Sequence, residues 1–182
     1  SIIWGFNTGG TQRTAVSTDK YGNVYSGGYF EPIYKIDADG NEVWSIYDFN
    51  SIYSLEVDKN NDVLYVGDND KLISYDLNKN KNWENDTGNY INDIVVGDDG
   101  IIYTCDSSRV LRKFDSDGNE LASQYINDVN GETFCLALNN QKGTLYVLNT
   151  QDSYLMEHNT NDLTQNWRYQ FNSTHQYKSN VI

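Results

Sequence analysis

The chain has 182 residues, a formal net charge of −13 and a sequence pI near 4.3. Aromatic residues make up 14% of it, and these residues favour strands, while the abundant Asn, Asp and Gly favour turns, so the composition predicts an all-β protein. The acidic balance argues against nucleic acid as a partner, because binding a phosphate backbone requires clustered Lys and Arg. No apolar run is long enough for a membrane helix, so we expect no membrane insertion.

An internal repeat of about forty residues runs through the sequence, a period typical of propeller blades. Each copy has an apolar run around a tyrosine, and these tyrosines are separated by 40, 38 and 43 residues: Tyr25, Tyr65, Tyr103 and Tyr146. A second landmark keeps the same phase, with Trp4, Trp44, Trp83 and Trp167 at equivalent positions and Ala122 replacing the tryptophan of the third copy. Two landmarks in one register establish the repeat.

Each copy divides into four short strand-like runs separated by turn residues such as Asp39-Gly40-Asn41. Four antiparallel strands repeated in this way predict the four-stranded blade of a β-propeller. The expected blades are 14–47, 53–86, 92–125 and 133–170, with partial end strands at 1–6 and 179–182. The fold class is therefore predicted to be an all-β propeller with four blades, part of a ring of five or more, with a four-bladed ring as the alternative.

Residues 23–44 carry the motif Asn-Val-Tyr-Ser-Gly-Gly followed by Ile-Tyr-Lys-Ile-Asp-x-Asp-Gly-Asn-Glu-Val-Trp, and residues 101–121 repeat much of it. This pattern resembles the PQQ-like β-propeller repeats, which are similar to WD40 units. Such repeats occur in quinoprotein dehydrogenases, outer-membrane assembly scaffolds and phage virion proteins. The resemblance implies a fold rather than an activity. It also implies that the repeated tryptophans dock between blades.

Residues for catalysis are scarce, and we expect no catalytic or cofactor-binding residue. If the chain were a quinoprotein dehydrogenase, the resemblance would imply a disulfide between adjacent cysteines. Cys105 and Cys135, the two cysteines of this chain, are 30 residues apart. We expect these cysteines to be two buried thiols, with a disulfide as the alternative. His158 and His175 are the only histidines, and no Gly-x-Ser-x-Gly elbow is present. His158 falls near the end of a third strand, where a packing or surface role is expected.

Two Asp-rich turns are weak candidates for calcium, because closely spaced side-chain oxygens around a glycine are typical of calcium loops. They contain Asp37 and Asp39 in the first repeat, and Asp115 and Asp117 in the third. The twelve-residue pattern with its terminal bidentate Glu is missing. A hairpin turn is the favoured interpretation, and the expected cofactor is none, with calcium as the alternative.

Propellers place recognition in loops at one face, here the links from fourth to first strand and from second to third. These segments differ between repeats, unlike the hairpin turns, and Tyr, Asn and Asp dominate them. Such residues suit carbohydrate or a polar protein interface. The candidate binding residues are Tyr29, Phe30, Asp48, Phe49, Asn89, Tyr90, Arg109, His175 and Tyr177.

The sequence therefore predicts a non-enzymatic binding or structural module that contacts a protein or a cell-surface glycan. The expected setting is a phage virion, as a tail or receptor-binding protein, or the cell exterior, and a homo-oligomer within a larger assembly is an option. The alternatives are an assembly scaffold in the cytoplasm or bacterial envelope and, less favoured, a quinone-dependent dehydrogenase or a hydrolase.

Overall fold

The structure, a computed structural model, describes residues 4–8, 16–131 and 134–171. Within these ranges the chain forms four separate antiparallel sheets of four strands each and contains no helix, so none that could span a membrane. In every sheet the strands are neighbours in chain order, as in a meander. The predicted all-β propeller architecture with four blades is confirmed.

The strands of blade 1 are β1 (Val16–Thr18), β2 (Val24–Gly28), β3 (Glu31–Ile36) and β4 (Glu42–Ile46). Those of blade 2 are β5 (Ile52–Asp58), β6 (Val63–Asp68), β7 (Lys71–Asp76) and β8 (Lys81–Asp86). Blade 3 holds β9 (Ile91–Val96), β10 (Ile102–Asp106), β11 (Val110–Phe114) and β12 (Glu120–Tyr125). Blade 4 holds β13 (Phe134–Asn139), β14 (Thr144–Asn149), β15 (Tyr154–Asn159) and β16 (Gln165–Gln170).

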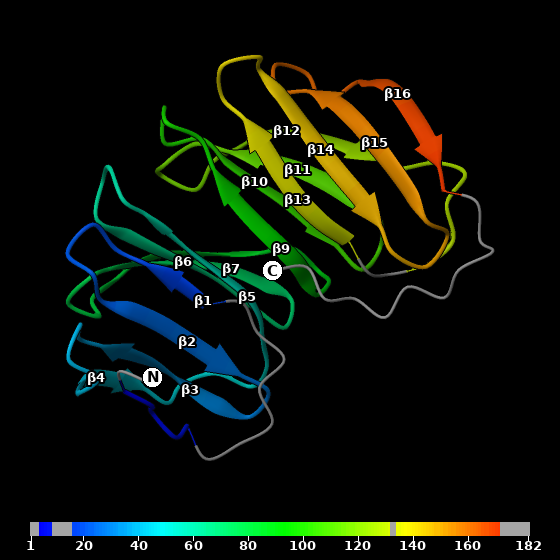
Figure 1. Cartoon of the computed structure of the whole chain (residues 1–182). Coiled ribbons are helices and arrows are strands. Elements are labelled where there is room, and N and C mark those ends of the chain that lie inside the picture. The colour runs from blue at the N-terminus through cyan, green and yellow to red at the C-terminus, as the bar shows by residue number, and fades with distance from the viewer. Residues whose placement is uncertain (1–3, 9–15, 132–133, 172–182) are drawn as a thin grey trace.

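The four blades follow one another side by side, with blades 1 and 2 at the lower left of Figure 1 and blades 3 and 4 at the upper right. Their first strands lie innermost: β1 packs beside β5, β5 beside β9, and β9 beside β13. Side chains on these strands bond across to the neighbouring blade. The Val57 amide donates to Ser17 Oγ at 3.1 Å, the Ser54 hydroxyl donates to the Ile91 carbonyl at 2.8 Å, and the Leu136 amide donates to the Asp93 carboxylate at 2.7 Å.

The second strands form the core because neighbouring blades cover both of their faces. All five residues of β10 are buried, and so are five of the six residues of β6. The tyrosine landmarks lie here, with Tyr25 fully buried and Tyr65 only 1% exposed. The fourth strands are much more exposed, as the polar sequence of an outer edge predicts.

The repeated tryptophans join consecutive units through one type of hydrogen bond. Three of the four indoles, those of Trp4, Trp44 and Trp83, donate to a backbone carbonyl in the turn between the third and fourth strands of the blade that follows. Trp44 Nε1 lies 3.1 Å from the Leu77 oxygen, and Trp83 Nε1 lies 2.9 Å from the Ser116 oxygen. Trp4 Nε1 reaches the equivalent Ala38 oxygen of blade 1 at 3.0 Å. The docking role that the resemblance implies for these three residues is present in the structure.

Glycine is required in two of these turns for two reasons. Gly40 and Gly118 have φ angles of 87° and 88°, where an L side chain is strained. A Cβ added to Gly40 would also lie 2.8 Å from the ring of Trp4, and one added to Gly118 would lie 2.9 Å from the ring of Trp83. The turn glycine therefore makes room for the indole that docks against it.

Two expectations change in detail. Residues 4–8 carry the docking Trp4 but do not form a strand. A fourth strand is held by pairing with the third strand of its own blade, and among the described residues no such third strand lies beside residues 4–8. The end strand expected at 179–182 lies outside the described residues. Both cysteines are free thiols, and Cys105 is buried as predicted. The prediction is wrong for Cys135, which is exposed because it alternates along β13 with the buried Phe134 and Leu136.

Candidate functional site

The turns between second and third strands lie beside the described links from fourth to first strands, and backbone hydrogen bonds join them. The Phe30 amide donates to the Asn50 carbonyl at 3.3 Å, and the Ser107 amide donates to the Tyr90 carbonyl at 2.9 Å. In blade 3 the Ile126 amide donates to the Arg109 carbonyl at 2.8 Å. We call this surface, formed by the turns between second and third strands and the links from fourth to first strands, the loop face.

Phe30 is the most unusual residue of the loop face. Its side chain is 70% exposed and its φ is 56°, in the left-handed region that bulky residues avoid. Tyr29, 44% exposed, lies edge to face against it with ring centroids 4.3 Å apart. A residue with a left-handed φ occurs in this turn in every blade, as Asn69, Arg109 and Ser153 show, so the turn itself requires that conformation. What sets Phe30 apart is the bulky apolar ring that occupies the position and is exposed to water.

Tyr90 provides a second exposed aromatic group on the same face. Its ring is stacked on that of Tyr53 at 4.6 Å, and its side chain is 44% exposed. The adjacent Asn89 is half-buried, and its carbonyl accepts a bond from the Thr87 hydroxyl at 3.2 Å. Tyr29 pairs with Ser51, two residues before Tyr53, so both aromatic groups flank the same link between blades 1 and 2.

Other predicted residues have a more structural placement. Phe49 is half-buried and packs edge-on against Tyr75 at 6.0 Å, within the core between blades 1 and 2. Arg109, at a φ of 68°, donates to the Val129 carbonyl at 2.6 Å and lies over the ring of Tyr125 at 5.1 Å. Arg109 thus fastens the link between blades 3 and 4. Asp48 is exposed beside the same link as Phe49, whereas His175 and Tyr177 lie outside the described residues.

The candidate calcium residues lie in the turns that receive tryptophans, away from the loop face. The Asp37 carboxylate accepts bonds from the amides of Asp39 and Asn41 at 3.0 and 2.8 Å, and Asp115 does the same with Asp117 and Asn119. The bonds from Asn41 lower the pKa of Asp37, and the Asn119 side-chain amide together with these backbone bonds lowers the pKa of Asp115. Among the described residues, no cluster of three acidic, His or Cys side chains is close enough to hold a metal ion.

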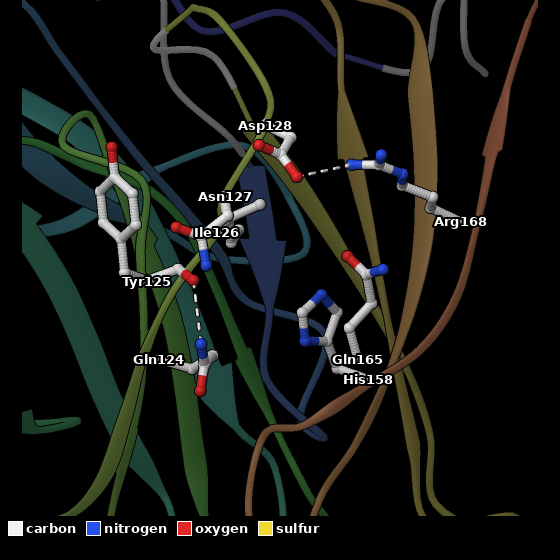
Figure 2. Close-up of a pocket in the computed structure, with 8 residues that line it drawn as sticks. All are labelled: Gln124, Tyr125, Ile126, Asn127, Asp128, His158, Gln165 and Arg168. Atoms are coloured by element: carbon white, nitrogen blue, oxygen red, sulfur yellow. Dashed lines mark hydrogen bonds and ion pairs between the residues drawn. The ribbon is translucent and has the colours of Figure 1, made fainter.

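A groove of about 400 Å³ lies between blades 3 and 4, beside the loop face (Figure 2). One wall is the end of β12 with the link that follows it, and the other wall is formed by β15 and β16. Arg168 and Asp128 face each other across it at 3.7 Å. The residues that line this groove are Gln124, Tyr125, Ile126, Asn127, Asp128, His158, Gln165 and Arg168.

His158 is the buried polar residue of this groove. It is 1% exposed, and its Nδ1 lies 2.9 Å from the Leu163 carbonyl, while Nε2 has no hydrogen-bond partner. The expected packing placement is correct, but the groove was not predicted. The available signal was a departure from the repeat, because Ile36, Tyr75 and Phe114 occupy the equivalent position in the other blades.

A second groove of about 330 Å³ lies at the corresponding place between blades 1 and 2. It contains Asp48 and Tyr75, the residue equivalent to His158. Three of its charged groups are paired, since Glu84 bonds Lys71 at 2.8 Å and Lys81 at 2.6 Å. These lysines lower the pKa of Glu84 to about 2.

Comparison with known proteins bears on the fold. A chain of the mitotic checkpoint complex has a TM-score of 0.75 at 11% identity, over 88% of this chain and 52% of that chain. BamB from Moraxella catarrhalis has a TM-score of 0.70 at 15% sequence identity, over 87% of this chain and 49% of that chain. A protein of unknown function from Bacteroides caccae has a TM-score of 0.68 at 13% sequence identity, over 92% of this chain and 63% of that chain. No family model and no curated protein matches.

The fold is that of a β-propeller. The first two of these neighbours are propellers, and they support the predicted WD40-like and PQQ-like repeat architecture. The chain spans about half to two thirds of the length of the structures it matches. At these identities the likeness concerns the fold alone.

Proposed function

We propose that this propeller is a non-enzymatic module that binds a protein partner through its loop face. The observation that carries the proposal is Phe30, an exposed aromatic side chain on a strained backbone, with Tyr29 packed against it and Tyr90 on the same face. Aromatic side chains supply much of the binding energy at protein interfaces. One propeller neighbour is part of a mitotic checkpoint complex, which supports use of the fold in a protein assembly.

The partner surface is expected to be basic. The chain carries 26 acidic against 13 basic residues, and Glu31 directly follows Phe30. The Asp70 carbonyl accepts a bond from the Thr87 amide, in the link that carries Tyr90. Electrostatic complementarity favours a partner rich in Lys and Arg and speeds its association at low ionic strength. Three further points stay predictions: a virion or extracellular location, a glycan partner, and the alternative role as an assembly scaffold.

A photo-crosslinking phenylalanine analogue placed at Phe30 tests the proposal. Irradiation with extract of the source cells should give a discrete crosslinked protein, and the yield should fall when Tyr90 is also replaced by Ala. The matched control carries the analogue at Tyr21, which is 65% exposed in the turn between β1 and β2. Equal yields from Tyr21 and Phe30, or a product that survives Tyr90→Ala undiminished, would contradict the proposal.

A further inference from the structure

The interface between blades 3 and 4 differs from the rest of the repeat at two positions. Ala122 replaces the docking tryptophan, and His158 replaces the apolar or aromatic residue that ends the third strand elsewhere. Both substitutions fall at the same interface, and both exchange apolar bulk for a smaller or more polar side chain. The groove of about 400 Å³ beside them is within the range of small-molecule sites.

The hydrogen-bonding state of His158 follows from its neighbours. A carbonyl oxygen only accepts, so the bond to Leu163 requires the proton on Nδ1. Burial lowers the pKa of His158, so the ring is neutral near pH 7 and Nε2 is an acceptor. Figure 2 shows this ring standing between the Gln124–Asp128 segment and the side chains of Gln165 and Arg168. A buried acceptor without a donor is unfavourable, and a bound hydroxyl group relieves it.

The other lining groups complement a neutral molecule that carries several hydroxyl groups. The Asp128 carboxylate accepts hydrogen bonds, the Arg168 guanidinium donates them, and the amides of Gln124 and Gln165 do both. Asp128 and Arg168 cancel in charge, and the net charge of −13 disfavours anions. An ionised carboxylate also lacks the proton that Nε2 needs.

We propose that this groove binds a single neutral sugar residue, with a sugar hydroxyl donating to Nε2 of His158. A site of this kind is independent of the aromatic residues of the loop face, so it does not rest on the protein-binding function. Binding by one shallow groove should be weak, with a dissociation constant on the order of 1 mM.

The test is titration of the ¹⁵N-labelled protein with methyl glycosides of glucose, galactose, mannose, N-acetylglucosamine and fucose. At least one glycoside should shift the side-chain amide signals of Gln124 and Gln165 together with the His158 Nε2 signal. His158→Phe should reduce the affinity for the glycoside by about tenfold or more, because the site loses its buried acceptor. Phenylalanine already occupies this position in blade 3 as Phe114, so the variant keeps a residue type that the repeat accepts.

Tyr75→Phe is the matched control, since it removes the polar group at the equivalent position of the groove between blades 1 and 2. It should leave glycoside binding unchanged. Arg168→Gln is a second test variant for the case that His158→Phe folds poorly, because Arg168 is on the surface, and it should also weaken binding. The proposal is overturned if no glycoside shifts these signals at about 50 mM, well above the expected constant. Undiminished binding in His158→Phe, or in Arg168→Gln, overturns it equally.

Discussion

Two interfaces, between blades 1 and 2 and between blades 3 and 4, use the same hydrogen-bond acceptor, a backbone carbonyl in the turn between third and fourth strands. They differ in the side chains that donate to it. In the first, Trp44 and Lys35 both donate to the Leu77 carbonyl, at 3.1 and 3.2 Å. In the second, Lys113 donates to the equivalent Thr160 carbonyl at 2.9 Å, and Ala122 stands where the tryptophan would be. The turn carbonyl is thus the constant element of the repeat, while the indole that covers it is replaceable.

The polar groups of the two grooves differ as well. Glu84 is held by two lysines between blades 1 and 2, whereas Nε2 of His158 has no partner between blades 3 and 4. A paired carboxylate such as that of Glu84 offers little to a ligand, while an unpaired buried acceptor offers a specific bond. Blades of one repeat can therefore carry either a closed interface or a recognition site.

The largest expected effect comes from removing a docked tryptophan. Trp44→Ala should lower the free energy of unfolding by about 3 kcal/mol, because it deletes a packed ring and its bond to Leu77. Trp167→Ala is the control, since this side chain is 41% exposed and no described carbonyl accepts from its indole. It should cost less than about 1 kcal/mol. Urea denaturation measures both, and equal losses would refute the docking role.

A second prediction concerns Asp93, whose carboxylate joins blade 3 to blade 4. Burial raises the pKa of Asp93 to about 6. The unfolded carboxyl ionises near pH 4, so the folded state loses stability as the pH rises from about 4 to about 6. Asp93→Asn keeps an acceptor for Leu136 and removes this loss. Between pH 4 and 7 the variant should gain about 2 kcal/mol relative to the wild type. Parallel stability curves would show that the carboxyl is not perturbed.

Restoring the repeat at the third tryptophan position should have a smaller effect. Ala122→Trp is expected to raise the free energy of unfolding by about 1 kcal/mol, through added apolar burial and a bond to the Thr160 carbonyl. The Lys113 side chain can keep its bond to this carbonyl. In the interface between blades 1 and 2, Lys35 and Trp44 both donate to the one Leu77 carbonyl. Thermal denaturation checks this. A lowered midpoint would mean that neighbouring side chains have closed the space.

The smallest expected effect is at Phe30. Phe30→Asn should stabilise the protein by about 0.5 to 1 kcal/mol, because Asn tolerates the φ of 56° better and removes an exposed apolar ring. The same change should weaken partner binding. Tyr21→Asn serves as the control, since Tyr21 is an exposed aromatic residue in the turn between β1 and β2, outside the loop face. A destabilised Phe30→Asn would indicate that the ring stabilises the fold by packing on Tyr29 rather than serving recognition.

The repeat could be read from the sequence because its landmarks are structural. Tyr65 and Trp83 occupy fixed places in the core and at the interface, so packing requires them at regular intervals. The observed strands span 16–46, 52–86, 91–125 and 134–170, close to the predicted blade ranges. The strand expected over residues 1–6 is not formed at 4–6, since strand formation depends on a pairing partner that a local pattern does not reveal.

The site was predicted less fully, because it depends on contacts between blades. Exposed aromatics such as Phe30 could be anticipated from loop variation, but its strained φ could not. Phe49 and Arg109 were expected at a binding surface, and the structure places them largely in packing and link contacts. The groove at His158 required knowing that Arg168 and Asp128, 40 residues apart, face each other across it.

Hydrogen exchange at the four indole NH groups, followed by NMR, tests the docking scheme most directly. Trp44 and Trp83, whose Nε1 atoms bond to turn carbonyls of the next blade, should exchange slowly, while Trp167 should exchange at close to the rate of a free indole. Rapid exchange at Trp44 and Trp83, or protection of Trp167 equal to theirs, would contradict the scheme by which these blades are joined.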